Sequence, residues 1–552
     1  MAKKLFTKVI IAVLLLSMML TLVVACGDNT ETTTTKKPAG TKDPVVTTGA
    51  EDPADTEDPA DTEDPADTDE PEDTEDEPAV TEAPTVSEYP AQLDGIKESL
   101  EDNTVEFIYV EASNGTYTAD SIWIDIDNAA EIDAVDQQII DRNNKIYDDL
   151  GITIEAFTDP TLGISGLQTF AKTYFDVQDP GIDVYCGYQY YDLKVALTGN
   201  LLNLNTIVNE NQETIIDISQ SYWATNYINS ITYNDLLFWV TGDLSLRYTG
   251  GLYCTFVNLD LYDTYVKNSY DGKSIYDIVN AKDWTMQTML DMADLVDEDT
   301  DGDGAASALD RLGIVYEPND IFDGLAFGCK IKFSQRTTSG GKDQISIYLM
   351  NDTRATTLAD YIKKMMGSMY AYDAGSNDSQ AMMPIFADGN VLFAVNKIYM
   401  SSVYLSQMER FAIIPTPLLD KNQDNYASGA HDGLTIFGIS KYSNCPIASA
   451  ATLELMAYYG SLLVTPTYVE AVLKGSETIH DPESIAMIDK IRAGFDSDFA
   501  AAWSEKVGNI VHIYRSKDNV TKFGSYVKVN SRTWPNQLST LLEDLEEIAA
   551  QQ

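Results

Sequence analysis

The chain has 552 residues, a formal net charge of −51 and 44% hydrophobic residues. Its length corresponds to about two to four domains, and its apolar content is sufficient for a large core. So negative a charge argues against binding to nucleic acid, or to anionic lipid through basic patches, because both need clustered Lys and Arg. Five cysteines are too few for a disulfide scaffold, and three histidines do not favour a His-rich zinc site.

The first 25 residues have the features of an export signal. Three lysines precede an apolar run at 9–24, which is short for a membrane span. The run ends in Val-Val-Ala-Cys at 23–26, which resembles the bacterial lipobox, whose cysteine is lipidated after cleavage. We therefore predict a signal peptide at 1–25, a lipidated Cys26, and an anchor at the extracellular face of the cell membrane. An ordinary secretion signal with a chance cysteine is the alternative, and no later stretch is expected to span a bilayer.

Residues 26–88 are rich in Thr, Pro, Asp and Glu, and the motif EDPADT occurs three times in succession from residue 51. Such a segment cannot bury enough apolar surface to offset its chain entropy, so it is predicted to be a disordered acidic tether. We interpret it as a spacer that lifts the folded body from the membrane. Cation binding by the repeats is the alternative, but they lack the glycine turns that would bring their carboxylates together.

From about residue 100 the pattern alternates between strand and helix. Period-two apolar positions predict strands at 105–109 and 122–126, and a helical pattern follows from Ile132 to Leu150, where Gly151 ends it. Further strands are predicted at 152–157 and 182–186, and a helical segment then runs to Leu204. Strands alternating with helices predict a mostly parallel α/β sheet, and the length of the body predicts two lobes.

Several short motifs, each weak alone, occur together in one order over roughly residues 100–515. They are AVDQQIIDRNNKIYDD at 134–149, DVY at 183–185, GNLLNL at 199–204, LYCTFVN at 252–258, DWT at 283–285, FADGNVLF at 386–393, IIPTP at 413–417, TYVE at 467–470 and DPES at 481–484. In this order they resemble the extracellular solute-binding proteins (family 1) of carbohydrate ABC importers, the group that includes maltose-binding protein.

The resemblance implies a two-lobe, type II periplasmic-binding-protein-like α/β fold with hinge crossings near 240–252, 400–408 and 438–442. The implied lobes are an N-terminal lobe of 89–245 plus 407–440 and a C-terminal lobe of 246–406 plus 441–552. It also implies a monomer that is not an enzyme, which closes on a sugar or oligosaccharide by hinge motion and delivers it to the membrane subunits of an ABC importer. The alternatives are a glycan-active surface enzyme, a glycan-binding adhesin without transport, and a binding protein for a peptide or another polar solute.

Candidate ligand-binding residues are aromatic and polar side chains at predicted strand ends and crossings, because rings cover sugar faces and polar groups bond hydroxyls. They are Tyr188, Gln189, Tyr190 and Tyr191 after the strand at 182–186, Trp239 and Asp243 at the first crossing, Asn396 and Tyr399 near the second, and His431 and Asp432 in a glycine-flanked loop. Packing in the core is the alternative for Trp239, and a solvent-exposed loop position is the alternative for His431. Trp503 and Tyr514 are expected to pack.

Residues 299–310, DTDGDGAASALD, match the spacing of an EF-hand calcium loop. The predicted ligands are the side chains of Asp299, Asp301, Asp303, Ser307 and Asp310 and the backbone carbonyl of Ala305. The aspartate at position twelve, in place of glutamate, has a shorter arm. We predict a structural calcium ion, and the alternative is a solvated acidic loop.

The cysteines after Cys26 are Cys186, Cys254, Cys329 and Cys445. They are widely spaced and lie in or beside apolar segments, so buried free thiols are predicted. A disulfide is the alternative in an exported chain. Neither a CxxC, HExxH, GxSxG nor P-loop pattern occurs in the required context, so the sequence carries no recognisable catalytic motif.

Overall fold

The computed structural model describes residues 88–100, 104–109, 122, 124, 132–158, 165–375, 379–430, 432–473 and 482–551. The predicted signal peptide, the lipidated Cys26, the tether up to residue 87, and His431 lie outside the described residues. One compact unit comprises Glu82–Gln552. All that follows concerns the described part of this unit.

The first lobe is built on a four-stranded sheet with the order β11-β3-β1-β2. β1 (Thr104–Tyr109) is parallel to β2 (Thr153–Thr158) and β3 (Val184–Tyr188), whereas β11 (Thr435–Ile439) is antiparallel to β3. Parallel neighbours need crossover connections, and helices α2 (Ala134–Leu150) and α3 (Leu167–Asp176) supply them. The prediction of an α/β sheet is therefore confirmed.

Local signals in α2 explain its two ends. The Asp133 side chain accepts hydrogen bonds from the Val135 and Asp136 amides, and Asp136 bonds back to the Asp133 amide. Gly151 ends the helix with φ 70°, a conformation that glycine adopts without strain. The predicted stop is confirmed.

The structure differs from the prediction of a strand at 122–126. Ile122 and Ile124, the only described residues of that stretch, lie outside any strand. Ile122 is buried and its carbonyl accepts a hydrogen bond from Arg142 Nη2 at 2.8 Å. Its apolar character therefore reflects packing beneath α2 and not pairing in the sheet.

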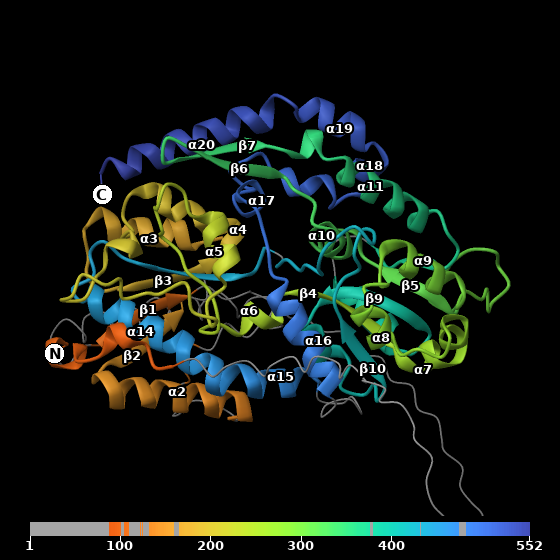
Figure 1. Cartoon of the computed structure of the whole chain (residues 1–552), viewed down its shortest axis with the longest axis horizontal. Helices are drawn as coiled ribbons and strands as arrows, with labels where there is room; N and C mark the ends of the chain where they lie inside the picture. The colour runs from red at the N-terminus through yellow and green to blue at the C-terminus, as the bar shows by residue number, and fades with distance from the viewer. Residues whose placement is uncertain are drawn as a thin grey trace, which may run out of the picture. The chain divides into compact units, whose positions relative to one another are not determined.

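The second lobe is built on a five-stranded sheet with the order β10-β4-β9-β5-β8. β4 pairs antiparallel with β9 and β10, and β5 pairs parallel with β8 and β9. The strands are β4 (Tyr253–Asn258), β5 (Leu312–Tyr316), β8 (Ala371–Asp373), β9 (Val391–Lys397) and β10 (Phe411–Ile414). Figure 1 shows this sheet beside the first one, with α10 and α9 around it.

Helices of the second lobe and the connecting regions are mostly short. The helices between β3 and the end of β10 are α4 (Gln189–Asp192), η3 (Leu193–Thr198), η4 (Leu204–Thr206), α5 (Thr225–Ile231), α6 (Leu246–Gly250), α7 (Leu259–Leu261), η5 (Tyr262–Val266), η6 (Lys267–Tyr270), α8 (Ile275–Asn280), α9 (Met286–Asp294), α10 (Pro318–Gly328), η7 (Leu349–Asn351), α11 (Thr353–Met366), α12 (Ser379–Ala387) and α13 (Met400–Tyr404). The helical segment predicted up to Leu204 is thus broken into short pieces.

The remaining elements are η1 (Ala91–Leu93), η2 (Ile96–Ser99), a hairpin of β6 (Ser334–Ser339) and β7 (Lys342–Ile347), and the C-terminal helices. These helices are α14 (Pro446–Tyr459), η8 (Gly460–Val464), α15 (Thr465–Leu473), α16 (Pro482–Ala493), α17 (Phe499–Ala502), η9 (Ile510–Ile513), α18 (Lys517–Thr521), α19 (Phe523–Asn530) and α20 (Thr533–Ala549).

The lobe boundaries differ from those predicted. β10 lies in the second sheet, so only β11 of the predicted range 407–440 belongs to the sheet of the first lobe. α14 packs in the first lobe, where Leu453 and Met456 join the same apolar cluster as Val105 of β1. Apolar runs in the sequence show that a strand or helix is buried, but not which sheet it joins.

The crossings are set by where strands pair. Val240 bridges Phe437 in the first lobe, and β4 begins the second sheet at Tyr253, so the chain crosses within the predicted range 240–252. It returns between Ala430, which bridges Leu252, and β11, which is earlier than the predicted 438–442. The crossing predicted at 400–408 is wrong, because β9 and β10 belong to one sheet.

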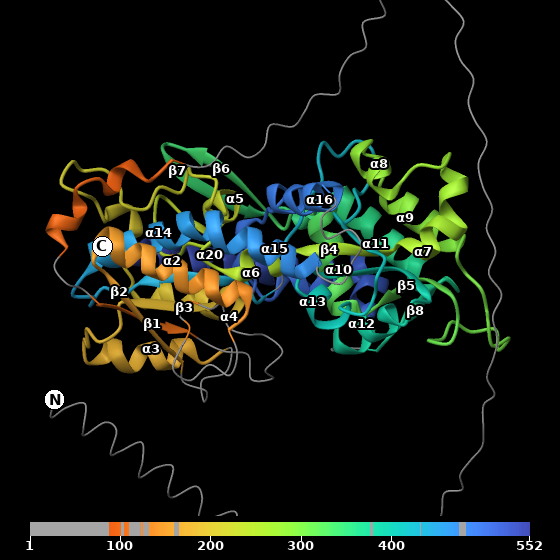
Figure 2. The same ribbon diagram turned by 90° about the horizontal axis from the view of Figure 1, so that it is seen from below.

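A long helical run, Pro446–Leu473, connects the lobes (Figure 2). Among the described residues it is the one helix long and apolar enough to cross a membrane, with 28 residues and a hydropathy of 1.3. This corrects the expectation that no stretch after the signal has these properties. Because 72% of its apolar window is buried inside the body, the run is interpreted as a core helix.

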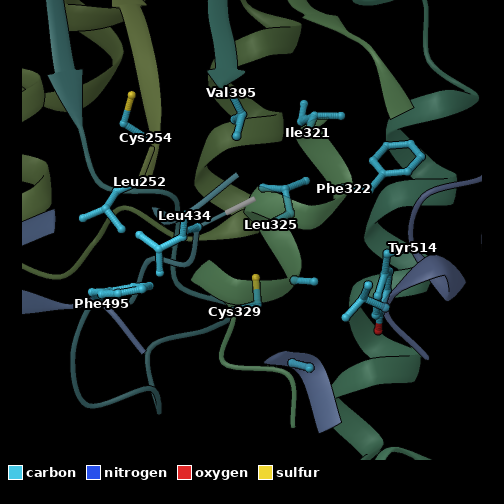
Figure 3. Packing of buried hydrophobic residues seen from close by; sticks show 14 of the residues in the cluster. Leu252, Cys254, Ile321, Phe322, Leu325, Cys329, Val395, Leu434, Phe495 and Tyr514 are labelled. Atoms are coloured by element: carbon cyan, nitrogen blue, oxygen red, sulfur yellow. The ribbon is translucent and has the colours of Figure 1, made fainter. Parts of the chain in front are cut away.

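The apolar core is continuous between the lobes. Leu252 and Leu434, on the two crossing segments, belong to one buried cluster with Leu325 of α10 and Tyr514 near the C-terminus (Figure 3). Cys186, Cys254 and Cys329 are buried thiols, as predicted, whereas the Cys445 thiol is half-buried. Burial raises the pKa of the Cys445 thiol to about 11, and Asp183 beside it adds to the shift.

Candidate functional site

The tyrosine-rich turn after β3 lies against the segment that leads into β11. The Tyr188 amide donates to Asp192 Oδ2 at 2.9 Å, and the Gln189 amide donates to the Leu434 carbonyl at 2.9 Å. The Tyr190 amide donates to the Asp432 carbonyl at 3.4 Å. Four of the predicted ligand-binding residues, Tyr188–Tyr191, therefore meet a fifth, Asp432, at the carboxyl end of a sheet strand, where α/β folds place ligands.

Tyr190 contacts the C-terminal region of the chain. Its hydroxyl donates to Asn509 Oδ1 at 2.6 Å and lies 3.3 Å from His512 Nε2. The Tyr190 and His512 rings stack with centroids 6.0 Å apart and an interplanar angle of 10°. Tyr191 packs edge-on against Tyr190, with centroids 4.9 Å apart. Aromatic faces and polar groups are thus brought together at one place, although they come from distant parts of the sequence.

Arg515 joins the two lobes at this place. Its Nη1 and Nη2 donate to the two carboxylate oxygens of Asp432, each at 2.7 Å. Its Nε donates to Asp323 Oδ2 of α10, in the second lobe, at 2.8 Å. The Arg515 side chain is 10% exposed and Asp323 is 2% exposed. The guanidinium therefore holds a buried carboxylate, Asp323, and a partly buried one, Asp432, which is 15% exposed.

Burial and neighbouring charges shift the pKa values of Arg515, His512 and Tyr190 in this cluster. Burial opposes ionisation of Arg515, but Asp323 and Asp432 raise its pKa, so the guanidinium stays charged. Burial and the neighbouring Arg515 lower the pKa of His512, and the imidazole is neutral at pH 7. Burial and the Asp432 carboxylate raise the pKa of Tyr190 to about 12, so its hydroxyl stays a donor. The cluster can therefore donate and accept hydrogen bonds with a neutral polar ligand.

α6, on the first crossing, connects both halves of the predicted site. The Arg247 guanidinium lies over the Tyr188 ring, with Cζ 4.9 Å from the centroid. The Gly250 carbonyl accepts a hydrogen bond from the Tyr399 amide at 3.0 Å. A Cβ on Gly250 would lie 2.2 Å from Tyr468 Oη, so a larger residue here would displace the Tyr468 side chain. Tyr188 and Tyr399 are thus both brought to the crossing.

Two predicted residues have buried polar atoms without a hydrogen-bond partner among the described residues. They are Gln189 Oε1 and Asn396 Nδ2, in residues that are 7% and 0% exposed. The Asn396 Oδ1 accepts from the Lys397 amide at 2.8 Å, which fixes the orientation of the amide group. Buried polar groups are normally hydrogen-bonded, so these two atoms depart from the usual pattern.

Trp239 lies in the core and not at the site. It is 2% exposed, and its Nε1 donates to the Leu193 carbonyl at 3.2 Å. A Cβ on Gly438 would lie 2.8 Å from the indole, which shows how tightly β11 covers it. The prediction that Trp239 binds ligand is therefore corrected to a packing role, which was its stated alternative.

The Asp243 carboxylate is also paired with side chains inside the protein. Arg492 Nη2 donates to its two oxygens at 2.7 and 2.8 Å, and Thr465 Oγ1 donates to Oδ1 at 2.8 Å. Asp243 is 4% exposed. Its carboxylate links the first crossing to α16 and does not face a ligand, so the predicted sugar contact is corrected to a buried ion pair.

Sequence reasoning missed several members of the cluster, namely Arg247, Asp323, Asn509, His512 and Arg515. None of them follows a strand in a recognisable motif, and Arg515 lies 83 positions from Asp432 and 192 from Asp323. Trp503 and Tyr514 pack, as predicted: the Trp503 indole donates to the Ile231 carbonyl at 3.4 Å and the Tyr514 hydroxyl to the Ala355 carbonyl at 2.9 Å.

The predicted calcium loop brings three of its six ligands together. Single carboxylate oxygens of Asp299, Asp301 and Asp303 lie within 4.8 Å of one another on the surface. Asp310 is 2% exposed, and its two oxygens accept the Thr300 and Ser307 amides, each at 2.8 Å. Ala305 is exposed. The Asp310 carboxylate thus organises the loop by accepting hydrogen bonds from the loop's backbone amides. The three converging aspartates fit a hard cation.

No protein-family model matches the chain, and no curated protein matches it. Among solved structures, the chain is similar to a cyclo/maltodextrin-binding protein complexed with maltotetraose, with 12% identity over 80% of this chain and 96% of that one, and a TM-score of 0.48. It is similar to the galacto-N-biose/lacto-N-biose I-binding protein of the ABC transporter from Bifidobacterium longum in complex with lacto-N-biose, with 10% identity over 81% and 98% and a TM-score of 0.48. It is also similar to an ABC substrate-binding protein from Listeria monocytogenes in complex with cycloalternan, with 10% identity over 80% and 99% and a TM-score of 0.46. At these scores the argument about function depends on the site of this chain itself.

Proposed function

We propose that this chain is a solute-binding lipoprotein that captures a sugar or oligosaccharide between its two lobes and delivers it to an ABC importer. The observation that carries the proposal is the convergence of Tyr188–Tyr191 with polar groups of both lobes at the carboxyl end of β3, where Gln189 Oε1 is buried and has no hydrogen-bond partner among the described residues. Aromatic faces with a few fixed polar groups suit the apolar faces and hydroxyls of a sugar. Binding, without chemical change of the solute, is the proposed activity.

The cellular setting follows from the N-terminus. We propose that Cys26 is lipidated and that the acidic tether holds a monomeric body at the extracellular face of the cell membrane. Mass spectrometry of the chain expressed in a bacterium that processes lipoproteins should show an N-terminal diacylglyceryl cysteine. An unmodified Cys26 in the secreted chain would support the ordinary secretion signal.

Thermal unfolding with a panel of oligosaccharides tests the binding proposal. A ligand that binds only the folded state raises the midpoint, and a concentration of a hundred times Kd adds about 2.7 kcal/mol. We expect one class of glycan to raise the midpoint selectively and to be recovered intact. Tyr190→Ala should weaken the binding of this glycan by about tenfold or more, because a ring contact and a hydroxyl are lost. A tenfold change in Kd is equivalent to about 1.4 kcal/mol.

Tyr147→Ala is the matched control, because Tyr147 is 55% exposed on α2, and it should leave the shift unchanged. Recovery of cleaved glycan would instead support the surface enzyme. A shift with peptides or other polar solutes, and with no sugar, would contradict the carbohydrate proposal. Binding without any change in lobe closure would support the adhesin.

We also propose that the loop of Asp299, Asp301 and Asp303 binds a structural calcium ion. Calcium should raise the unfolding midpoint of the wild-type chain, and Asp301→Asn should reduce the rise, because the affinity of such loops depends on the number of carboxylate ligands. Asp294→Asn, an exposed position on the nearby α9, should retain the full rise. An equal response of wild type and Asp301→Asn would leave the loop as a solvated acidic segment.

A further inference from the structure

The hairpin of β6 and β7 leaves the second lobe between α10 and α11. Its base is anchored by Asp498, whose carboxylate accepts the Phe333 amide at 2.7 Å, the Ser334 amide at 3.1 Å and the Ser334 hydroxyl at 2.7 Å. The tip turns at Gly340 and Gly341, which have φ of 61° and 78°. Figure 1 shows the hairpin running along α20, which contacts β7, and Figure 2 shows α5 beside the hairpin.

The hairpin is hydrogen-bonded to the first lobe through a side chain of β6. Arg336 Nη2 donates to the Ser230 and Thr232 carbonyls at 3.1 and 2.6 Å. These carbonyls are at the C-terminal end of α5, where carbonyls lack helical partners and a cation is favoured. The contact therefore places the Arg336 charge at a helix end that favours a cation.

A reciprocal pair lies beside it. The Asn234 amide donates to Asp343 Oδ2 at 3.0 Å, and the Asp343 amide donates to Asn234 Oδ1 at 2.7 Å. Arg336 Nη1 lies 3.4 Å from the same Asp343 carboxylate, so the two contacts are coupled. We call Arg336, Asp343 and Asn234 the latch.

We propose that the latch fastens the second lobe to the first and restricts opening of the interlobe site before any solute binds. The hairpin leaves the second lobe, whereas Ser230–Asn234 belong to the first lobe. The chain that follows them is fixed there, because the Leu237 amide donates to Asn203 Oδ1 and Val240 pairs with β11. A rotation about the crossing segments displaces one partner from the other. The latch is thus broken by opening and re-formed by closure.

The strength of the latch suits a reversible contact. Its members are polar, and the Arg336 and Asp343 side chains are 31% and 17% exposed, so water competes for their hydrogen bonds and the net stabilisation is small. α20 packs over the same face, where Tyr233 donates to Glu546 Oε1 at 3.2 Å, so the latch is one part of a layer that spans both lobes. The proposal concerns motion of the lobes and does not depend on the identity of the solute.

Distances between spin labels on the two lobes test this in the full chain without solute. Labels are placed at Asn144→Cys on α2 and Asp294→Cys on α9, both exposed, with Cys445 replaced by serine. The wild-type chain should give one narrow distance distribution. Arg336→Ala/Asp343→Ala should add a second, longer population of about 10% or more, at or above the upper end of the range usual for a minor state.

Lys342→Ala/Gln344→Ala is the matched control, since both residues are exposed in the same hairpin, and it should keep the narrow distribution. Arg336→Gln serves as the second variant if the double variant does not fold. A latch variant with the wild-type distribution, or a wild-type chain that is already broadly distributed, would overturn the proposal. Neither result would bear on sugar binding, which is measured separately.

Discussion

Replacing Arg515 with alanine is expected to lower the free energy of unfolding by about 3–5 kcal/mol, because the buried Asp323 carboxylate and the partly buried Asp432 carboxylate would remain without a counter-ion. Both carboxylates lie 2.7–2.8 Å from the guanidinium, and the Arg515 side chain is only 10% exposed. Urea unfolding of the wild type and the variant at pH 7 measures the difference.

Two further variants make this result interpretable. Lys517→Ala removes a cation that pairs with Asp373 and is 52% exposed, and it should change stability by less than about 1 kcal/mol. Arg515→Met combined with Asp323→Asn and Asp432→Asn should recover much of the loss, because no buried charge is then left unpaired. A loss below about 1 kcal/mol for Arg515→Ala would show that water reaches the two carboxylates.

Replacing Glu454 with alanine is expected to cost about 3 kcal/mol or more, because its carboxylate is the acceptor for four donors inside the first lobe. These are Tyr222 Oη at 2.6 Å, Gln92 Nε2 at 3.1 Å, Trp223 Nε1 at 3.1 Å and the Asp217 amide at 3.2 Å. Glu454 is fully buried in α14. Glu470→Ala, at an exposed position on α15, is the matched control in the same unfolding experiment.

The buried Glu454 carboxyl group also predicts that the free energy of unfolding depends on pH. Burial raises its pKa to about 7, against the opposing hydrogen bonds from Tyr222, Asp217 and Trp223. The folded state then binds the proton more tightly than the unfolded state, so the stabilisation present below pH 4.5 is lost as the pH rises toward 7. The stability of the wild type relative to Glu454→Gln should fall by an amount on the order of 3 kcal/mol over this range. A constant difference would show that the carboxylate is ionised throughout.

Local signals in the sequence predicted the elements of the fold well. Apolar residues located β1, β2 and β3 to within about two residues, by alternation in β1 and as a short apolar run in β3, which is buried at every position. Gly151 ends α2 as predicted, since a left-handed stop is a property of one residue. The same signals could not assign β10 to the second sheet, because an apolar strand fits either sheet.

In the candidate site, too, the sequence predicted local features but not contacts between distant residues. Tyr188–Tyr191 were found because they follow a strand directly, and a strand end in an α/β sheet is a position that the sequence reveals. Trp239 and Asp243 were misassigned because a residue near a crossing can face either the core or a ligand. Their partners, the Leu193 carbonyl and Arg492, lie 46 and 249 positions away.

The sequence by itself determined the alternation of strands and helices, the tyrosine-rich turn after β3 and the acidic calcium-like loop, since each depends on residues that are neighbours in the chain. Only the tertiary structure decided which charges meet: Arg515 with Asp432 and Asp323, Arg492 with Asp243, and Arg336 with the end of α5. The physical reason is that burial of apolar surface brings distant segments together without regard to their separation along the chain. An ion pair between them then depends on that packing and leaves no periodic pattern in the sequence.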